Sequence, residues 1–236
     1  MKQVISSVNF TKQGGQFITP FSTLKKRAAL IRAFIFDWDG VFNDARKTGE
    51  SQSYFTEIDS MGTNLLRFSH WMKNNYQLPL TAVISGEQND AAKFFLSREH
   101  FHAGYFQAKN KRIAFDHFCA QHNLQPKEIA FIFDDVLDMS VAAEAGVRIC
   151  VYRKSNPLMN DFLLRNNLVD YFTANSGANN AVRESMELLM ALNGNSEEVF
   201  ASRMKYDKTY NSYISARNGS ETVFYSSKED FIRKMK

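Results

Sequence analysis

The sequence contains little cysteine and no long apolar run, and these absences exclude several classes of protein. Its 2 cysteines, Cys119 and Cys150, lie in apolar surroundings, and there is neither a CxxC motif nor a Cys/His cluster. A disulfide-stapled fold and a zinc site are therefore not indicated, and two buried thiols fit a reducing compartment. No apolar run approaches the ~18 residues that a membrane-spanning helix needs. We expect a cytoplasmic protein that does not enter a membrane.

Acidic residues are missing from the first 36 positions, where every charged residue is lysine or arginine. This basic start faintly resembles a transit peptide, but it has no apolar signal core, so we interpret it as an ordinary N-terminal extension. The formal net charge of the whole chain is +4. That excess would suit an anionic substrate, although scattered surface lysines explain it more simply. No recognised nucleic-acid module is present, so we expect no nucleic-acid partner.

The most informative stretch is residues 34–42, which read FIFDWDGVF. Its short apolar run predicts a buried strand of a parallel sheet. Asp37 and Asp39 would then lie at the carboxyl end of that strand, which is the edge where open α/β sheets bind ligands. Two carboxylates this close repel each other unless a cation lies between them, and Mg²⁺ prefers oxygen ligands. Taken alone, an ordinary acidic turn explains the stretch equally well, so the interpretation depends on the rest of the chain.

Further along, short apolar runs alternate with helical patterns, which predicts βαβ units and an α/β fold with a parallel sheet. Hydrophobic residues make up 44% of the 236 residues, which is enough for the core of one large domain with appendages. We expect strands at 33–37, 80–84, 103–106, 129–133, 147–152 and 170–173. We expect helices at 22–31, 60–75, 88–98, 110–122, 136–145, 157–167 and 179–193.

Three segments differ from this alternation within a predicted domain of residues 22–194. Residues 1–21 are polar and contain a Gly-Gly pair, so we interpret them as a loose N-terminal arm. Residues 41–58 place a Lys-Thr-Gly-Glu turn signal between β-forming residues, which predicts a β-hairpin directly after the first acids. Residues 195–236 contain too many aromatic residues for a disordered tail. We expect this C-terminal extension to dock on the core or on a neighbouring subunit.

Two groups of polar residues follow later strands in the same way. Ser85 and Gly86 end the strand at 80–84, where a hydroxyl and free backbone N–H groups can hold phosphate oxygens. A helix cap at Ser85 is at least as common an explanation. Lys111 begins a helix and could neutralise a phosphoryl group, with Lys109 and Arg112 as competing candidates.

A second set of acids, Asp134, Asp135 and Asp138, follows the predicted strand at 129–133. Two strand-end acid groups that are far apart in sequence are much harder to explain as ordinary turns. Because the carboxyl ends of parallel strands share one edge of the sheet, these acids and the pair at 37 and 39 predict an oxygen-rich cation site.

In chain order, the acids at 37 and 39, the Ser85–Gly86 pair, Lys111 and the acids at 134–138 form four groups. These groups resemble motifs I to IV of the haloacid dehalogenase (HAD) superfamily, most of whose members are Mg²⁺-dependent phosphatases. The hairpin after the first motif, the lack of room for a cap domain, and the segments 110–115 (NKRIAF), 134–138 (DDVLD) and 181–184 (AVRE) resemble one capless branch. That branch contains the 3-deoxy-D-manno-octulosonate 8-phosphate phosphatases and the sialic-acid 9-phosphate phosphatases. The resemblance implies a Rossmann-like three-layer core without a large cap, and hydrolysis of a small phosphorylated sugar or sugar acid.

The resemblance also implies catalytic roles. Asp37 would be the nucleophile that forms an aspartyl-phosphate, and Asp39 the general acid and then the general base. Ser85, Gly86 and Lys111 would bind the transferring phosphoryl group.

The implied cofactor is Mg²⁺, and its implied ligands come from both acid groups. Asp37, the backbone carbonyl of Asp39, and Asp134 would hold the ion, and Asp135 or Asp138 would complete the outer shell. The resemblance further implies a homotetramer in which the hairpins at 41–58 cover neighbouring active sites.

The chain departs from the branch at several positions. Glu87 stands where an arginine follows the glycine of motif II, Phe133 replaces a glycine in motif IV, and residues 59–62 read DSMG in place of Asp-Gly-Tyr-Gly. These departures leave the substrate open. They also keep open the alternative of a catalytically weak scaffold or regulatory domain that forms tetramers. A phosphatase acting on nucleic acid is a further alternative, suggested only by the basic N-terminus.

Overall fold

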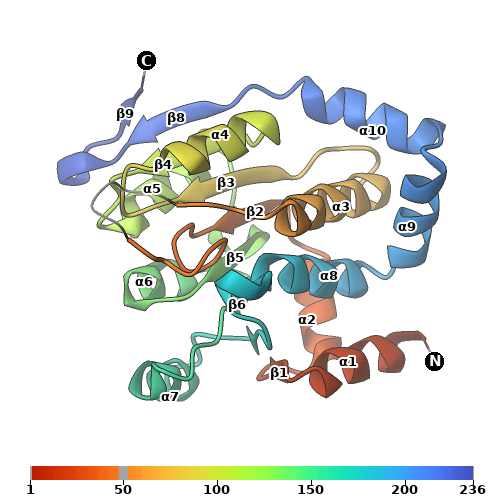
Figure 1. Cartoon of the computed structure of the whole chain (residues 1–236), viewed down its shortest axis with the longest axis horizontal. Helices are drawn as coiled ribbons and strands as arrows, with labels where there is room; N and C mark the ends of the chain where they lie inside the picture. The colour runs from red at the N-terminus through yellow and green to blue at the C-terminus, as the bar shows by residue number, and fades with distance from the viewer. Residues whose placement is uncertain (1, 48–52, 236) are drawn as a thin grey trace.

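The structure, a computed structural model, describes residues 2–47 and 53–235 (Figure 1). Within these residues nine strands form one sheet, in the order β1-β7-β6-β5-β2-β3-β4-β8-β9. The strands are β1 (Gln16–Phe17), β2 (Ala33–Phe36), β3 (Leu80–Ile84), β4 (Ala103–Phe106), β5 (Ile129–Phe133), β6 (Val147–Cys150), β7 (Tyr171–Phe172), β8 (Val223–Ser226) and β9 (Arg233–Lys234). Neighbouring strands from β7 to β8 in this order run parallel, and only β1 and β9 pair antiparallel, at the two margins.

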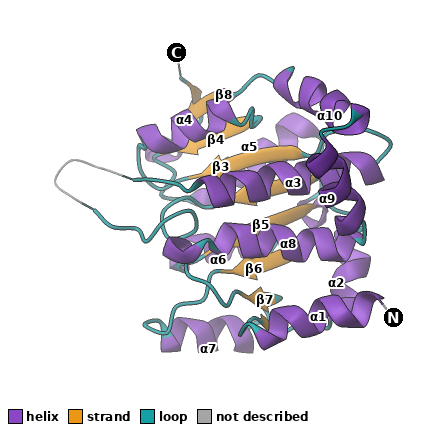
Figure 2. Ribbon diagram, turned by 45° about the vertical axis from the view of Figure 1, so that its right-hand side comes forward, coloured by secondary structure: helices purple, strands orange, loops and turns teal. Residues whose placement is uncertain are grey.

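Helices cover both faces of the sheet, which makes three layers (Figure 2). They are α1 (Lys2–Lys12), α2 (Phe21–Ala28), α3 (Glu57–Lys73), α4 (Asp90–Arg98), α5 (Lys111–His122), α6 (Met139–Ala142), α7 (Pro157–Arg165), α8 (Ala181–Asn193), α9 (Ser196–Lys205) and α10 (Lys208–Asn218). Alternate residues of a strand face opposite ways, so Phe34 and Phe36 pack with α3, α4 and α8, while Ala33 and Ile35 pack with α5 and α6. The predicted α/β architecture without a large cap is confirmed.

The site predicted from the sequence depends on the order of the central strands. Strand β2 lies between β5 and β3, and Phe36 pairs with Ile132 on one side and Val83 on the other. The ends of β2, β3 and β5 therefore meet at one edge of the sheet. Because the chain moves outward from β2 through β3 and β4 and then returns to β5 on the other side, this edge is a topological switch point, where open α/β sheets bind ligands.

The prediction of a loose arm over residues 1–21 is wrong. Helix α1 and strand β1 occupy most of it, and β1 pairs with β7 at the margin of the sheet. Two aromatic residues explain the difference, because Phe17 and Phe10 pack on Tyr171 with ring centroids 4.9 and 6.3 Å apart. Buried aromatic contacts of this kind can order a segment whose composition is otherwise polar.

The β-hairpin predicted at 41–58 is only partly within the described residues, since its tip at 48–52 lies outside them. The flanking residues 41–47 and 53–56 form no strand, so the prediction of strands there is wrong. Side chains hold the two limbs together instead. The Asn43 carboxamide donates to Ser53 Oγ at 2.9 Å and to the carbonyl of Tyr54 at 3.1 Å, and Trp38 Nε1 donates to Ser53 Oγ at 2.7 Å.

The C-terminal extension docks on the core, as predicted. Tyr210 and Tyr213 of α10 are buried, and both rings contact Phe68 of α3. Beyond α10 the chain adds the strand β8, which the composition did not predict. β8 pairs parallel with β4, and the ring of Tyr225 stacks on that of Tyr105 with centroids 4.9 Å apart. The extension is thus part of the sheet.

Most other elements begin and end within a few residues of their predicted bounds. The exception is the predicted helix at 136–145, which is a 3₁₀ turn at Val136–Asp138 followed by the short α6. In the described part of the chain, no helix has both the length and the apolar character that crossing a membrane requires.

Candidate active site

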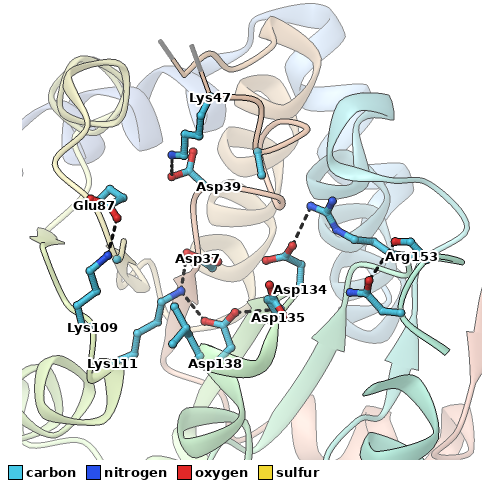
Figure 3. Close-up of a pocket in the computed structure, with 15 residues that line it drawn as sticks. Asp37, Asp39, Lys47, Glu87, Lys109, Lys111, Asp134, Asp135, Asp138 and Arg153 are labelled. Atoms are coloured by element: carbon cyan, nitrogen blue, oxygen red, sulfur yellow. Dashed lines mark hydrogen bonds and ion pairs between the residues drawn. The ribbon is translucent and has the colours of Figure 1, made fainter. Parts of the chain in front are cut away.

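A cavity of about 300 Å³ opens at the carboxyl edge of the central strands (Figure 3). Both signs of charge are present on its wall, together with a few small and amide residues. The lining residues are Asp37, Asp39, Ala45, Lys47, Gly86, Glu87, Lys109, Lys111, Asp134, Asp135, Leu137, Asp138, Arg153, Ser155 and Asn156.

Three buried carboxylates and one lysine form the centre of this cavity. Asp37 follows β2, Asp134 follows β5, and Asp138 ends the 3₁₀ turn. One carboxylate oxygen of each lies within 4.8 Å of the others. Lys111 Nζ lies 2.6 Å from Asp37 Oδ1 and 2.6 Å from Asp138 Oδ1. The structure therefore brings together residues that are about 100 positions apart in the sequence, as the strand-end rule predicted.

Burial among like charges opposes ionisation of these acids. Burial raises the pKa of Asp37 to about 7, even though Lys111 acts in the opposite direction. Burial, with the charge of Asp37, raises the pKa of Asp138 to about 7, and burial with Asp138 raises that of Asp134 to about 6. Burial lowers the pKa of Lys111, but Asp138 and Asp37 outweigh it and raise the pKa above its ordinary value. The lysine stays charged, but the nearby cations do not outweigh the effect of burial on the pKa values of the three acids.

The donor atoms present fit a divalent cation. Asp134 Oδ1 is buried and has no hydrogen-bond partner among the described residues when the acids are ionised; Asp37 can donate to the Asp134 carboxylate only while Asp37 is protonated. Such an orphaned oxygen costs free energy unless a ligand satisfies it. Three converging carboxylates supply the hard oxygen ligands that Mg²⁺ prefers. Asp138, the predicted outer-shell residue, belongs to the same carboxylate group, and Lys111 and the backbone N–H of Asp135 contact its two oxygens.

Asp39 is placed differently from the three clustered acids. Lys47 Nζ lies 2.7 Å from its Oδ2, and Ser53 Oγ donates to its Oδ1 at 3.2 Å. Its side chain points toward the limbs of the 41–58 segment, above Asp37 (Figure 3). Gly40 makes this turn possible, because its φ of +92° lies in the region that favours glycine. Asp37 and Asp39 therefore face different partners although they are two residues apart.

Of the residues predicted to bind phosphate, Gly86 and Lys111 line the cavity and Ser85 lies behind its wall. Ser85 is almost fully buried, and its hydroxyl accepts a hydrogen bond from the backbone of Glu87 at 3.3 Å. The alternative role of Ser85 as a helix cap is wrong, because α4 begins at Asp90 and Asn89 caps it through a bond to Ala92.

The remaining charged candidates, Lys109, Arg112 and Asp135, differ in where they lie relative to the cavity. Lys109 lies at the rim of the cavity, with its Nζ 2.5 Å from Glu87 Oε1. Arg112 is turned away toward Asp116 and Glu144 and does not line the cavity. The Asp135 side chain accepts a hydrogen bond from its neighbour Val136 at 2.7 Å and so caps its own turn.

Sequence reasoning missed Arg153 and Lys47. Arg153 follows β6, and its Nη2 lies 2.8 Å from Asp134 Oδ2. The rule that found the acids would also have found Arg153, since it too stands just after a parallel strand. Lys47 belongs to the turn signal at 47–50, where it was interpreted only as part of a hairpin.

Comparison with known proteins finds clear relatives, although no family model matches the chain. This chain is 28% identical over 199 residues to the 3-deoxy-D-manno-octulosonate 8-phosphate phosphatase KdsC of Salmonella typhi. The aligned region covers 80% of this chain and 96% of that protein. The structure of the phosphatase of that name from Yersinia pestis is similar, with a TM-score of 0.62, 25% identity, and coverage of 74% and 89% of the two chains. The Moraxella catarrhalis phosphatase, crystallised with magnesium, phosphate and KDO, shares the fold with a TM-score of 0.63 and 22% identity, over 76% and 97% of the two chains.

Proposed function

We propose that this chain, which has the HAD fold and resembles KdsC phosphatases in sequence, is a metal-dependent phosphatase for a small phosphorylated sugar or sugar acid. The observation that supports this most strongly is the contact of Lys111 with Asp37 and Asp138, beside Asp134, at the floor of the cavity. This arrangement pairs a carboxylate nucleophile with the positive charge that phosphoryl transfer requires. The cavity of about 300 Å³ is large enough for a small organic phosphate.

In the proposed reaction Asp37 attacks phosphorus. A bond forms between its carboxylate oxygen and phosphorus, the ester P–O bond breaks, and Asp39 gives a proton to the departing alcohol. Asp39 then takes a proton from a water molecule that attacks the aspartyl-phosphate, which releases inorganic phosphate and restores Asp37. Lys111 offsets the negative charge of the phosphoryl oxygens throughout.

Asp37, Asp134 and Asp138 would hold the Mg²⁺ ion together with the backbone carbonyl of Asp39. When bound, the ion supplies positive charge that screens the carboxylates and the phosphoryl oxygens from one another. The raised pKa values of the three acids support this assignment, because a cation would favour their charged forms.

The rim of the cavity bears on the choice of substrate. Glu87, where the octulosonate phosphatases have arginine, is paired with Lys109 at 2.5 Å, so its negative charge is offset at the rim. Lys47 and Arg153 add positive charge on other sides of the cavity. Within the proposed class of substrates, we therefore expect an acid sugar phosphate to be preferred.

Phosphate release from a panel of sugar and sugar-acid phosphates tests the proposal. We expect turnover with Mg²⁺, none with EDTA, and a preference for the acid sugars. Turnover confined to neutral sugar phosphates would discard the substrate class and keep the chemistry. No release from any substrate by the folded protein would favour the scaffold alternative.

We also propose that the protein is a homotetramer assembled through the 41–58 segment. Large apolar side chains are exposed in this segment at Tyr54 and Ile58, and on helix α4 at Phe94. Exposed large apolar side chains are what an interface between subunits would cover. Deleting 41–58 would remove the buried Val41 and Phe42, so the better test is the double variant Ile58→Lys and Phe94→Lys. We expect it to sediment as a smaller species, and an unchanged tetramer would contradict this assembly.

A further inference from the structure

Arg153 stands out among the charged residues of the cavity because nothing in the motif pattern assigns it a role. It lies in the loop between β6 and α7, and its side chain reaches back across the cavity to Asp134 (Figure 3). Nη2 lies 2.8 Å from Asp134 Oδ2, and the arginine side chain is 27% exposed. The backbone of Arg153 is anchored as well, since the buried Asn160 donates from Nδ2 to its carbonyl at 3.0 Å.

The two oxygens of Asp134 have different surroundings. Oδ2 faces Arg153, whereas Oδ1 is buried and has no hydrogen-bond partner among the described residues. The backbone at Gly40 is packed directly against this pair, because a Cβ there would overlap both Asp134 Oδ2 and Arg153 Nη2. The turn that carries Asp39 is therefore shaped around the Asp134–Arg153 ion pair.

We propose that Arg153 is a positioning residue that holds Asp134 by Oδ2 and so presents Oδ1 to the divalent cation. This inference rests on the metal site of the proposed function. Groups that orient a metal ligand from behind typically change metal affinity 10- to 100-fold when they are removed. The contact is an ion pair, because neither Nη2 nor Nε of Arg153 has a hydrogen-bond partner among the described residues. Its attraction holds Oδ2 on the side of the guanidinium group.

A purely electrostatic role for Arg153 predicts the opposite sign. With the three acids ionised, Asp37, Asp134 and Asp138 contribute −3, and Lys111 and Arg153 contribute +2, so the formal charge of the centre is −1. Without Arg153 that charge becomes −2. Charge alone would then strengthen the binding of a dication, whereas loss of positioning weakens it. The direction of the change therefore distinguishes the two roles.

The experiment is a calorimetric titration of Mg²⁺ into the substrate-free, full-length protein. We expect Arg153→Met to weaken Mg²⁺ binding about 10- to 100-fold. Arg153→Lys, which keeps the charge on a shorter side chain, should lie between this variant and the wild type. The matched control is Lys154→Met, which removes one positive charge at the next residue, outside the cavity lining, and should bind within about twofold of the wild type.

Tighter or unchanged Mg²⁺ binding by Arg153→Met would overturn the proposal. An unchanged Mg²⁺ affinity with a raised KM for the substrate would assign Arg153 to substrate binding instead, which also overturns it. Thermal melts without metal confirm that each variant is folded, and Arg153→Gln replaces the Met variant if that one is not. If the wild type binds no divalent cation, this inference and the metal site of the proposed function fail together. Metal binding that is insensitive to Arg153 defeats only the inference.

Discussion

Two of the places where this protein buries carboxylates among cations differ in how completely the carboxylates are satisfied. One is the cavity centre with Asp37, Asp134 and Asp138. The other is Asp170, which precedes β7 at the opposite edge of the sheet and is also fully buried. Both lie within the same folded unit, so the difference between them arises from their local partners.

Asp170 has a partner for every direction in which it can accept a hydrogen bond. Arg148 donates to Oδ2 from its backbone N–H and from Nε, both at 2.9 Å, and its Nη2 lies 2.8 Å from Oδ1. Arg27 and Thr19 donate to Oδ1 at 2.8 and 2.5 Å. Burial alone would raise the pKa of Asp170, but Arg148, Thr19 and Arg27 outweigh it and hold the pKa below its ordinary value.

The cavity acids show the opposite shift, because one lysine and one arginine serve three carboxylates. A buried acid that has all its partners ties elements together, and here Asp170 joins α2, β6 and the segment after β1. A group of buried acids with too few partners is unstable by itself and is suited to receive a cation. The comparison therefore fits a structural role for Asp170 and the ligand-binding role that we propose for the cavity.

The largest effect that we expect comes from Asp37→Asn. Removing the proposed nucleophile should lower kcat on the order of 10⁴-fold or more, as for other covalent catalysts. The fold should persist, because the substitution relieves like-charge repulsion with Asp134. Steady-state phosphate release and a thermal melt provide the two measurements. Substantial remaining turnover would remove Asp37 from the role of nucleophile.

The next effect is on stability and uses the same chemical change at both places. Asp170→Asn should lower the free energy of unfolding by about 3–5 kcal/mol, because it leaves the buried Arg148 without a compensating charge. At pH 7 and without metal, Asp138→Asn should change it by about 1 kcal/mol or less, since Lys111 keeps Asp37 as a partner. Urea denaturation with EDTA present measures both. Equal costs for the two variants would contradict the distinction between the centres.

A divalent metal should stabilise the folded protein by binding in the cavity and not at Asp170. At 100 times its dissociation constant, Mg²⁺ should add about 2.7 kcal/mol to the stability of the wild type. Asp134→Asn should abolish this increment. Asp170→Asn should retain it, although the free energy of unfolding of that variant without metal is lower than that of the wild type. Denaturation with and without Mg²⁺ gives the increment for each variant, and an increment that survives Asp134→Asn would place the metal elsewhere.

Sequence reasoning recovered the cavity better than the structural centre, for a physical reason. Acids that directly follow an apolar run, such as Asp37 and Asp134, are visible because strand ends share one edge of a parallel sheet. Asp170 carries no comparable signal, since its partners Thr19, Arg27 and Arg148 come from segments whose pairing only the folded chain creates. The same holds for β1 and β8, whose strands depend on contacts of Phe17 and Tyr225 with distant aromatic residues. Local pattern predicted the elements of the core, and long-range packing determined its margins.

The effect of pH is the smallest per pH unit, and it separates the two centres by sign. Without metal, the pKa of Asp138 in the folded protein is raised from 3.8 to about 7, so its contribution to stability is present below pH 4 and is lost as the pH rises to 7. The stability of the wild type relative to Asp138→Asn should therefore fall with rising pH, by at most about 1.4 kcal/mol per pH unit. The contribution of Asp170, whose pKa is lowered, should be lost only when the pH falls below about 4.

Saturating Mg²⁺ should reverse the slope at the cavity, because the ion binds the deprotonated carboxylates and protons compete with it. Urea denaturation of the wild type and Asp138→Asn between pH 4.5 and 7.5, roughly the window between the two pKa values of Asp138, measures the slope with EDTA and again with Mg²⁺. A slope that keeps its sign when Mg²⁺ is added would mean that the clustered acids do not bind the ion. A slope that reverses would show that the unsatisfied charge of this centre is what the cation compensates.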